Sequence, residues 1–208
     1  MNGAPTLKTN ESMKRKAEVY RKTKETEISV VLNLDGSGVA DIKIPIGFLA
    51  HLITAFTQHS LINLKVRAKG DLEVDQHHLT EDLGLVLGQA LAKALSDKKG
   101  IRRFGFVAVP MDEALVETTV DISGRPFLFL ELPRLPRNKG YFEFSDAREF
   151  LNAFVKTSGI TLHAETRRGQ NQHHILEALF KSLGRALKEA VSLEPRLKGK
   201  IPSTKGEL

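Results

Sequence analysis

The sequence predicts an α/β (α+β) fold in which two fused copies of one module each form a sheet backed by helices. Two observations carry this prediction. Strand-like segments alternate with helix-like segments along most of the chain. In addition, residues 76–94 and 172–190 match in register, including Gln-His-His followed by Glu at the same spacing. Both halves run in the order helix, strand, loop and histidine-containing helix, so duplication of one unit accounts for the pattern.

The first half shows these elements in turn. Residues 27–34 and 39–44 read as strands and are separated by Asp-Gly-Ser-Gly, which predicts a turn between them. Residues 47–56 predict a helix, and residues 62–68 predict a third strand. After a polar loop, the first histidine-containing helix is expected to run to about Leu95.

The second half begins with three predicted strands and then repeats the order helix, strand, loop and helix. These elements are expected at residues 103–109, 115–121, 127–132, 146–155, 160–166 and 173–191. The half-modules are expected to span residues 15–97 and 98–195. Residues 1–14 predict a polar tail, and residues 196–208, rich in Gly, Pro and Lys, predict an extended or flexible one.

Composition restricts the possible classes of function. With 208 residues, of which 41% are hydrophobic, the chain can bury a substantial core. No apolar run approaches membrane-spanning length and the first residues lack a signal-peptide core, so we expect no membrane partner. The absence of cysteine excludes disulfides, thiolate ligands and cysteine catalysis, and it fits a cytoplasmic protein.

The net charge of +6 is spread over four basic clusters, and this distribution does not favour a nucleic-acid partner. Two tyrosines and no tryptophan leave few platforms on which bases could stack. We therefore expect a solvated surface or sites for small anionic ligands. The clusters lie at residues 14–24, 98–103, 134–139 and 196–205.

The repeated His-His-x-x-Glu motif is the strongest functional signal. Residues four apart share a helix face, so His77 aligns with Glu81, and His173 aligns with Glu177. The second histidine of each doublet points about 100° away. Two doublets therefore predict two metal ions, each bound by a His/Glu pair from one copy and a single histidine from the other. Histidine and carboxylate ligands suit manganese, iron or zinc.

Further segments occur in an order that one family shows. They are KETEISVVLNLDGSG, IGFLAH, the two HHxxE motifs, RRFGFVAVPMDEAL, VDISGRPF, the GxNxHH that contains Gln170, and IPSTKGEL. With these segments the chain resembles the imidazoleglycerol-phosphate dehydratases of histidine biosynthesis. The resemblance implies a hydro-lyase that converts imidazole glycerol phosphate to imidazole acetol phosphate. It also implies a duplicated module of the ribosomal protein S5 domain 2-like type.

The same resemblance implies a cofactor and an assembly. It predicts two manganese ions per active site and active sites that form between subunits. The subunits are expected to build a homo-oligomer of about 24 chains from trimers, with closed point-group symmetry.

The resemblance divides the metal ligands into two sets of four. One set is His173, Glu177, His78 and His51, and the other is His77, Glu81, His174 and Glu149. Many relatives have histidine where this chain has Glu149, and glutamate is a harder ligand. Glu25 is expected to transfer a proton, although without the resemblance it would be read as a surface charge. The predicted catalytic residues are Glu25, His51, His77, His78, Glu81, His173 and Glu177.

A substrate- and phosphate-binding set follows from the resemblance as well. Arginine suits bidentate phosphate contacts, and Lys181 follows His173 by two helical turns on the same face. We expect residues 196–208 to close on bound substrate. Any one of these cations, taken alone, would be read as a surface charge. The set is Glu25, His51, His59, Arg103, Arg125, Lys181, Ser203 and Lys205.

Two positions depart from the family pattern. Ala50 precedes the first ligand where the family usually has Asp, and Ile44-Pro45 replaces the usual Thr-Gly. Loss of a carboxylate that supports a ligand can cost about 10–100-fold in metal affinity or activity. His163, in a predicted strand, is expected to support the ligands without binding a metal itself.

Two other classes of function remain open. A different dinuclear metalloenzyme acting on a small phosphorylated substrate, such as a phosphoester hydrolase, would use the same ions and cations but release inorganic phosphate. A non-catalytic, metal-dependent assembly would keep the eight ligands and need neither Glu25 nor the phosphate-binding residues.

Overall fold

The structure, a computed structural model, describes residues 15–135 and 142–208, which contain two four-stranded sheets. The tail expected at residues 1–14 and part of the basic cluster at 134–139 lie outside the described residues. The first sheet has the spatial order β1 (Lys16–Lys22), β2 (Thr26–Asn33), β4 (Asn63–Gly70), β3 (Ala40–Lys43). The second has the order β5 (Phe104–Met111), β6 (Ala114–Asp121), β8 (Thr161–Arg168), β7 (Phe127–Glu131).

Four α-helices accompany the sheets within the described ranges. In each sheet the first three strands in spatial order pair antiparallel, and the last strand, β3 or β7, pairs parallel to its neighbour. The shared order and pairing confirm the predicted duplicated fold. The helices are α1 (Gly47–Ser60), α2 (His77–Leu95), α3 (Phe144–Ser158) and α4 (Gln172–Val191).

The sequence pattern does not predict β1, because most residues of this strand are charged or polar. Val19 is its only buried residue. The strand nevertheless pairs with β2 along its whole length, from Lys16 opposite Asn33 to Lys22 opposite Glu27. Pairing with a neighbour, and not a hydrophobic pattern of its own, therefore defines β1.

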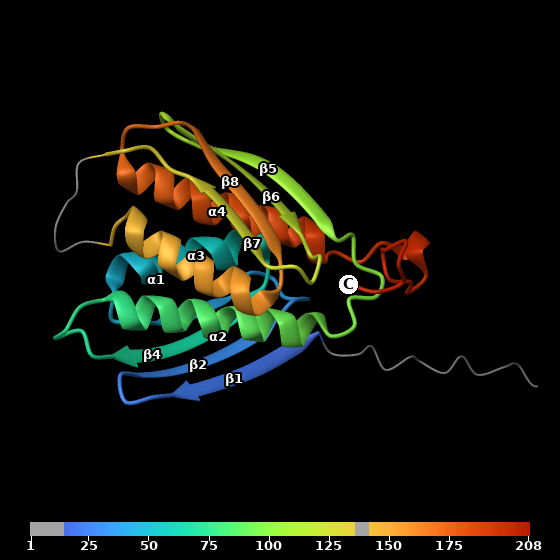
Figure 1. The fold of residues 1–208 in the computed structure, drawn as a ribbon, viewed down its shortest axis with the longest axis horizontal. Helices are drawn as coiled ribbons and strands as arrows, with labels where there is room; N and C mark the ends of the chain where they lie inside the picture. Colours follow the sequence, from blue (N-terminus) through green and yellow to red (C-terminus); the bar gives the residue numbers. More distant parts are fainter. Residues whose placement is uncertain (1–14, 136–141) are drawn as a thin grey trace, which may run out of the picture.

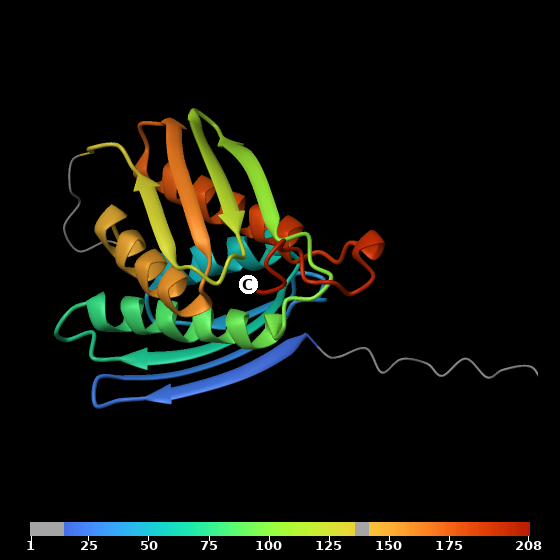
Figure 2. The same cartoon turned by 45° about the vertical axis from the view of Figure 1, so that its right-hand side comes forward.

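The helices lie between the two sheets, as Figures 1 and 2 show. α1 packs on α4, and α2 packs on α3. In each half, the helix that precedes the doublet therefore contacts the doublet helix of the other half. The four helices begin at one end of the molecule, on the left in Figure 1. This exchange brings residues of both copies together at that end.

Two repeat-related glycines allow these helix pairs to approach closely. A Cβ at Gly88 of α2 would lie 2.4 Å from the Phe154 carbonyl oxygen of α3. A Cβ at Gly184 of α4 would lie 2.6 Å from the Phe56 carbonyl oxygen of α1. Packed interiors leave no room for atoms at such distances, so the glycine match in the repeat reflects one packing requirement met twice.

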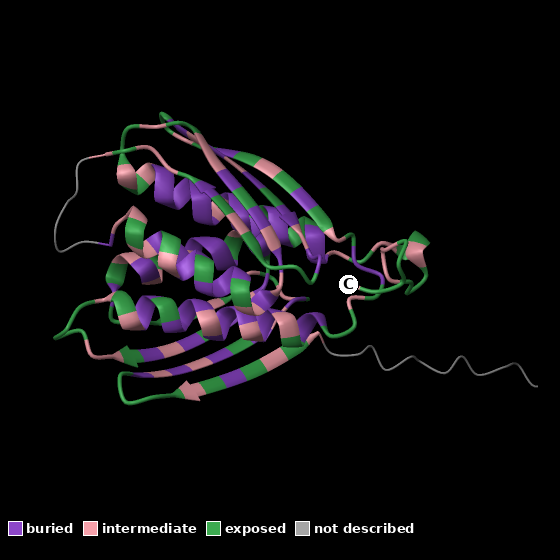
Figure 3. Cartoon of the chain, viewed as in Figure 1, coloured by how far each residue is buried: buried purple, intermediate pink, exposed green. Residues whose placement is uncertain are grey.

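The core fills the space between the sheets, with buried residues on the helices and on alternate positions of the strands (Figure 3). The outer face of the second sheet keeps large apolar side chains exposed. Among the described residues, no helix combines the length and the apolar character needed to cross a bilayer. The exposed large apolar side chains of this sheet are Phe104, Phe106, Phe127 and Phe129.

The C-terminal segment, residues 196–208, folds back on the end of the molecule where the helices finish (Figure 1). After a short 3₁₀ turn at Pro195–Leu197 the segment has no regular structure. The Gly100 N–H donates to the Lys200 carbonyl at 2.9 Å, and Lys98 Nζ donates to the Leu208 carbonyl at 2.9 Å. Hydrogen bonds therefore hold this irregular segment to the start of the second half.

Candidate metal centre and active site

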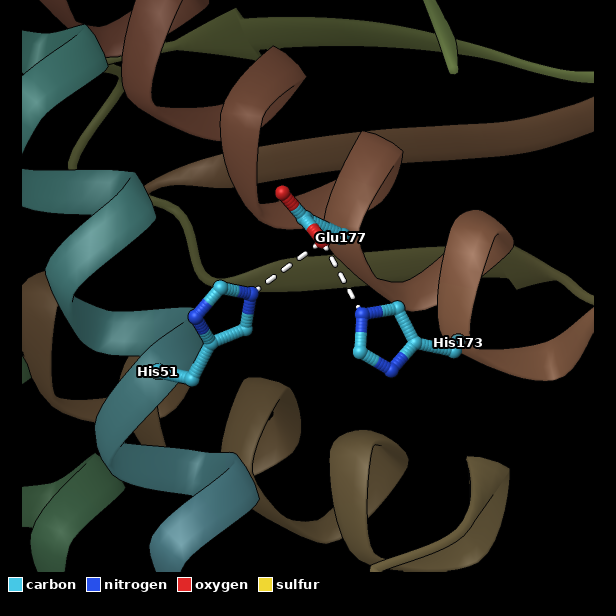
Figure 4. Close-up of side chains that lie close together, drawn as sticks. All are labelled: His51, His173 and Glu177. Carbon is cyan, nitrogen blue, oxygen red and sulfur yellow. Dashed lines mark hydrogen bonds and ion pairs between the residues drawn. The ribbon is translucent and has the colours of Figure 1, made fainter. Parts of the chain in front are cut away.

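Three predicted ligands converge where α1 meets the first turns of α4. His51 Nε2 and His173 Nε2 each lie 3.1 Å from the same oxygen of Glu177, Oε2 (Figure 4). Their three ligand atoms lie within 4.8 Å of one another. His51 comes from the first half of the chain and the other two residues from the second. Packing of α1 on α4 thus builds the cluster from both copies.

The start of α4 is fixed by its N-cap. The Asn171 side chain accepts hydrogen bonds from the backbone N–H groups of His173 at 2.9 Å and His174 at 3.4 Å. This cap places the doublet in the first turn. The Phe48 ring of α1 packs 4.6 Å from the His173 ring and 6.0 Å from the His51 ring, centroid to centroid. Both imidazoles are thereby restricted in orientation.

Glu177 carries a negative charge in this cluster although its side chain is mostly buried. Burial alone would raise the pKa of the Glu177 carboxyl, but Lys181 and His51 outweigh it and hold the pKa at about 2. Lys181 Nζ lies 2.7 Å from Glu177 Oε1, while Oε2 faces the two histidines. One carboxylate thus joins a cation of the predicted phosphate set to the predicted metal ligands.

A divalent cation fits this donor set. Two imidazole nitrogens and one carboxylate oxygen are ligands that manganese, iron and zinc accept. Within the described residues this is the only group in which three such donors converge. Three protein ligands also leave coordination positions open for substrate or for a further ligand.

The second predicted set is only partly assembled within one chain. His77 Nε2 lies 3.6 Å from Glu81 Oε2 on the exposed start of α2. Asp146 of α3 accepts a hydrogen bond from Gln76 at 2.8 Å, so α3 lies beside this turn. Glu149, one turn further along α3, is half-buried, and in the described part of the chain it forms no ion pair with a histidine. Its assignment as a ligand stays a prediction.

The second histidine of each doublet turns away from these groups. His78 Nδ1 lies 3.0 Å from Asp71 Oδ2 and 3.9 Å from Glu25 Oε2. His174 Nδ1 lies 2.7 Å from Glu113 Oε2. Within one chain, His78 therefore does not join His51, and His174 does not join His77, although the sequence assigns each pair to one ion.

Carboxylates near these two rings raise the pKa of both histidines. The hydrogen bond to Asp71 raises the pKa of His78, and the hydrogen bond to Glu113 raises the pKa of His174. In turn, the His174 ring and two backbone N–H groups lower the pKa of Glu113 to about 2. Glu113 is therefore a fixed negative charge beside the second doublet.

An open cavity of about 560 Å³ adjoins the start of α1 and the turn before α2. Phe48 lines it and also packs on His173, so the cavity borders the three-ligand cluster. Gln76, the residue before the first doublet, lines the same cavity. The cavity is thus lined by residues that adjoin each of the two predicted metal groups. Its other lining residues are Pro45, Ile46, Gly47, Leu72, Asp75 and Phe142.

Half of the predicted substrate- and phosphate-binding set lies elsewhere. Arg103 forms a bidentate pair with Asp121, at 2.7 and 3.1 Å, and donates to the Pro202 carbonyl of the C-terminal segment at 2.9 Å. Arg125 lies 3.7 Å from the same aspartate. Because Ser203 and Lys205 follow Pro202, both arginines and the end of the chain form one group at the tail.

This tail group is distant from the three-ligand cluster. The Arg103 N–H donates to the carbonyl of Ala190, which lies thirteen residues after Glu177 on α4. At 1.5 Å per residue, this places the Arg103 backbone about 20 Å along the helix from Glu177. Of the lysines and arginines in that set, Lys181 is therefore the one that lies next to the cluster in the same chain.

His59 and His163 occupy different surroundings. Burial lowers the pKa of His59, and nearby Lys181 and Arg185 lower it further, so His59 lies among cations on the α1–α4 side. His163 lies on the outer face of the second sheet, with ring centroids 5.6 Å from Phe127 and 5.5 Å from Phe129. In the described part of its own chain, His163 contacts none of the predicted ligands.

Three acidic residues of these groups are not found by sequence reasoning. Asp71 and Glu113 contact the second histidines, and Asp121 holds the two arginines. Asp121 belongs to the VDISGRPF segment and Glu113 to PMDEAL, so both lie in segments that carry the resemblance. Their roles depend on contacts across 18 and 61 residues, which no local spacing reveals.

Fold and site together define a class of duplicated α+β proteins with a His-His-x-x-Glu helix in each half. The sequence profile of the imidazoleglycerol-phosphate dehydratase family matches residues 44–187. The imidazoleglycerol-phosphate dehydratase of Thermoanaerobacter pseudethanolicus is 58% identical over 93% of this chain and its own full length. That of Caldanaerobacter subterraneus subsp. tengcongensis is 57% identical with the same coverage.

Solved structures agree with the sequence comparison. The imidazoleglycerol-phosphate dehydratase of Staphylococcus aureus shares 37% identity and a TM-score of 0.76, covering 85% of this chain and 98% of that one. The Pyrococcus furiosus enzyme, solved in complex with (S)-C348, shares 36% identity and a TM-score of 0.79. The match covers 91% of this chain and 100% of that one. The chain therefore belongs to the imidazoleglycerol-phosphate dehydratase family, and it is a hydro-lyase of histidine biosynthesis. The predicted family is confirmed, and a non-catalytic assembly is no longer favoured.

The departure at Ala50 leads to a prediction. Among the described residues, no hydrogen bond reaches Nδ1 of His51, and Ala50 is half-buried against the core. Ala50→Asp is expected to tighten manganese binding, by up to about tenfold, because an acceptor beside the ring would orient it. Manganese titration of the variant measures this effect.

A control separates this effect from helix stability. The first turn of α1 has no acidic residue, so the new carboxylate also favours the helix start by about 0.3–1 kcal/mol. Melting the metal-free variant beside Ala50→Asn measures that contribution. Weaker manganese binding together with a lower melting temperature would show that the site has repacked around Ala50.

Proposed function

We propose that the chain dehydrates imidazole glycerol phosphate to imidazole acetol phosphate with two manganese ions per active site. The observation that carries this proposal is the convergence of His51, His173 and Glu177 from both halves of the duplicated chain. Family membership supplies the substrate class. Divalent ions at these positions would serve as a template and as a Lewis acid toward the imidazole ring of the substrate.

We further propose that each active site is shared between subunits. The rings of His78 and His174 contact Asp71 and Glu113 and not the ligand sets to which the two histidines are assigned. The tail group with Arg103 lies about 20 Å from Glu177 along α4. A substrate with one ring, a three-carbon chain and a phosphate cannot touch both groups in one chain. A neighbouring copy that supplies the missing histidine and the tail cations resolves both discrepancies.

Glu25 is the proposed acid–base residue. Water leaves as a hydroxyl from one carbon of the glycerol chain and a proton from the adjacent carbon, and the resulting enol becomes the ketone. Glu25 Oε2 lies 3.9 Å from His78 Nδ1, at the turn between β1 and β2. Its side chain is 55% exposed, so it can reach a substrate bound at His78. A carboxylate there can accept the carbon-bound proton.

The phosphate of the substrate would bind to the cations of the tail group and to Lys181. Arg103 is pre-oriented because Asp121 accepts hydrogen bonds from Nε and Nη2 along one edge of its guanidinium group. Ser203 and Lys205 follow the residue whose carbonyl accepts from Arg103. We propose that residues 196–208 close on the phosphate, and that His59, whose pKa is lowered by burial and by the nearby Lys181 and Arg185, adds a neutral hydrogen-bonding group beside them.

The outer face of the second sheet supports assembly. Four exposed phenylalanines lie on its two edge strands, β5 and β7, with His163 between two of them. Large apolar side chains left exposed on one face of a sheet commonly mark a protein interface. We propose that this face packs on further copies of the chain to form the trimers of an assembly of about 24 subunits.

The test of the proposed reaction is an assay that follows two products together. Metal-stripped protein supplied with manganese and imidazole glycerol phosphate is expected to form the ketone without releasing inorganic phosphate. Without added metal, turnover is expected to fall to background. Release of phosphate without ketone would instead identify a phosphoester hydrolase and overturn the proposal.

A further inference from the structure

The second histidine of each doublet is held by a carboxylate through the same ring nitrogen. His78 Nδ1 lies 3.0 Å from Asp71, and His174 Nδ1 lies 2.7 Å from Glu113. An ionised carboxylate only accepts hydrogen bonds, so each neutral ring carries its proton on Nδ1. The lone pair then lies on Nε2, which points away from the carboxylate. Asp112 lies 3.6 Å from His174 Nε2, beyond hydrogen-bonding distance.

The two carboxylates are not copies of each other. His78 and His174 are equivalent in the repeat, yet Asp71 lies in the loop before α2, whereas Glu113 lies at the tip of the β5–β6 hairpin. The position equivalent to Asp71 in the second half is Arg167. Asp71 and Glu113 are therefore not related by the duplication, although the β1–β2 turn, the counterpart of the β5–β6 hairpin, also places Glu25 3.9 Å from His78 Nδ1. Two unrelated elements supply the same group to the same nitrogen, which indicates a requirement set by the rings.

We infer that Asp71 and Glu113 are positioning residues that fix the tautomer and direction of His78 and His174. They hold Nε2 of each ring ready for a divalent ion whose other ligands belong to a neighbouring chain. This inference rests on the proposed metal-dependent function. His51 and His173 differ from these two rings, because their Nε2 atoms lie 3.1 Å from Glu177 Oε2 within the same chain.

The two carboxylates differ in how many of their oxygens accept hydrogen bonds, and this difference makes the inference testable. Glu113 Oε2 accepts from His174, while Oε1 accepts from the N–H groups of Gln170 at 3.1 Å and Asn171 at 2.9 Å. An amide has one acceptor oxygen. Glu113→Gln must therefore lose either the hydrogen bonds from the Gln170 and Asn171 N–H groups or the one from the His174 ring. If its NH₂ faces the ring, Nδ1 becomes the acceptor, and a proton on Nε2 excludes the metal.

Asp71 is expected to tolerate the same change better. Its Oδ2 faces His78, whereas Oδ1 is buried with no hydrogen-bond partner among the described residues. Asp71→Asn can therefore keep its carbonyl oxygen toward the ring and preserve the tautomer. The charge is lost, but the Nε2 lone pair remains. The matched control is Glu117→Gln, on the same hairpin as Glu113, where the carboxylate holds Arg167 and no histidine.

The experiment is a manganese titration of metal-stripped protein, with free Mn²⁺ counted by electron paramagnetic resonance. Wild type and Glu117→Gln are expected to bind two ions per subunit. Glu113→Gln is expected to weaken one of the two sites by about 10–100-fold and leave the other unchanged. Asp71→Asn should weaken the other site by a smaller factor.

Several outcomes would overturn the inference. Glu113→Gln binding both ions as wild type does would exclude a positioning role. Equal weakening of both sites, with a lower melting temperature of the metal-free variant, would show a structural role only. Wild-type protein that binds no manganese would overturn the inference and the proposed function together, whereas the first two outcomes leave the proposed function intact.

Discussion

Glu25→Gln is expected to lower kcat by about 10²–10⁴-fold, the range that general acid–base catalysis contributes. The amide matches the carboxylate in size but cannot take up the proton that leaves carbon. Metal content and particle size should not change, because Glu25 lies 3.9 Å from His78 Nδ1 and is not a proposed ligand. Steady-state turnover and elemental analysis of one preparation check both parts.

The matched control is Glu27→Gln, two residues along the same hairpin. Glu27 accepts hydrogen bonds from Tyr20 at 3.0 Å and Lys22 at 3.2 Å on the exposed surface, and it faces no histidine. This variant should keep the wild-type kcat. A Glu25→Gln variant that keeps most of its turnover would show that another group moves the proton. Loss of metal in that variant would instead assign Glu25 a role as ligand.

Removal of the metal is expected to break the large assembly into smaller oligomers, because the fourth ligand of each ion is proposed to come from a neighbouring chain. Metal-binding energy then contributes directly to association. The apolar face with Phe104, Phe106, Phe127 and Phe129 does not depend on metal, so trimers should persist. Light scattering before and after chelation, and again after manganese is restored, follows the change. A large particle that persists when confirmed metal-free would contradict the shared site.

The fold could be predicted from sequence to the extent that its halves repeat. The match of Gly88 with Gly184 reports the same close helix approach in both copies. The position of His51 in the first half could be related to the second half by the repeat, and the structure places His51 beside His173 and Glu177. β1 could not be predicted, because its charged residues are ordered by pairing with β2.

The site could be predicted only where its residues lie on one helix or follow the resemblance. His173 and Glu177 are four residues apart, and residues at this spacing lie next to each other on one face of a helix. Glu113 and His174 are 61 residues apart and meet only because the β5–β6 hairpin reaches the start of α4. The separation of Arg103 from Glu177 likewise depends on which part of α4 lies beside the start of β5. The sequence does not predict this contact.

Two divalent ions per subunit are the feature on which catalysis, shared sites and assembly all depend. Elemental analysis of protein prepared without chelator and reconstituted with manganese measures it directly. We expect close to two ions per subunit, one for each His-His-x-x-Glu helix. A reproducible value near zero after reconstitution would contradict the dinuclear site.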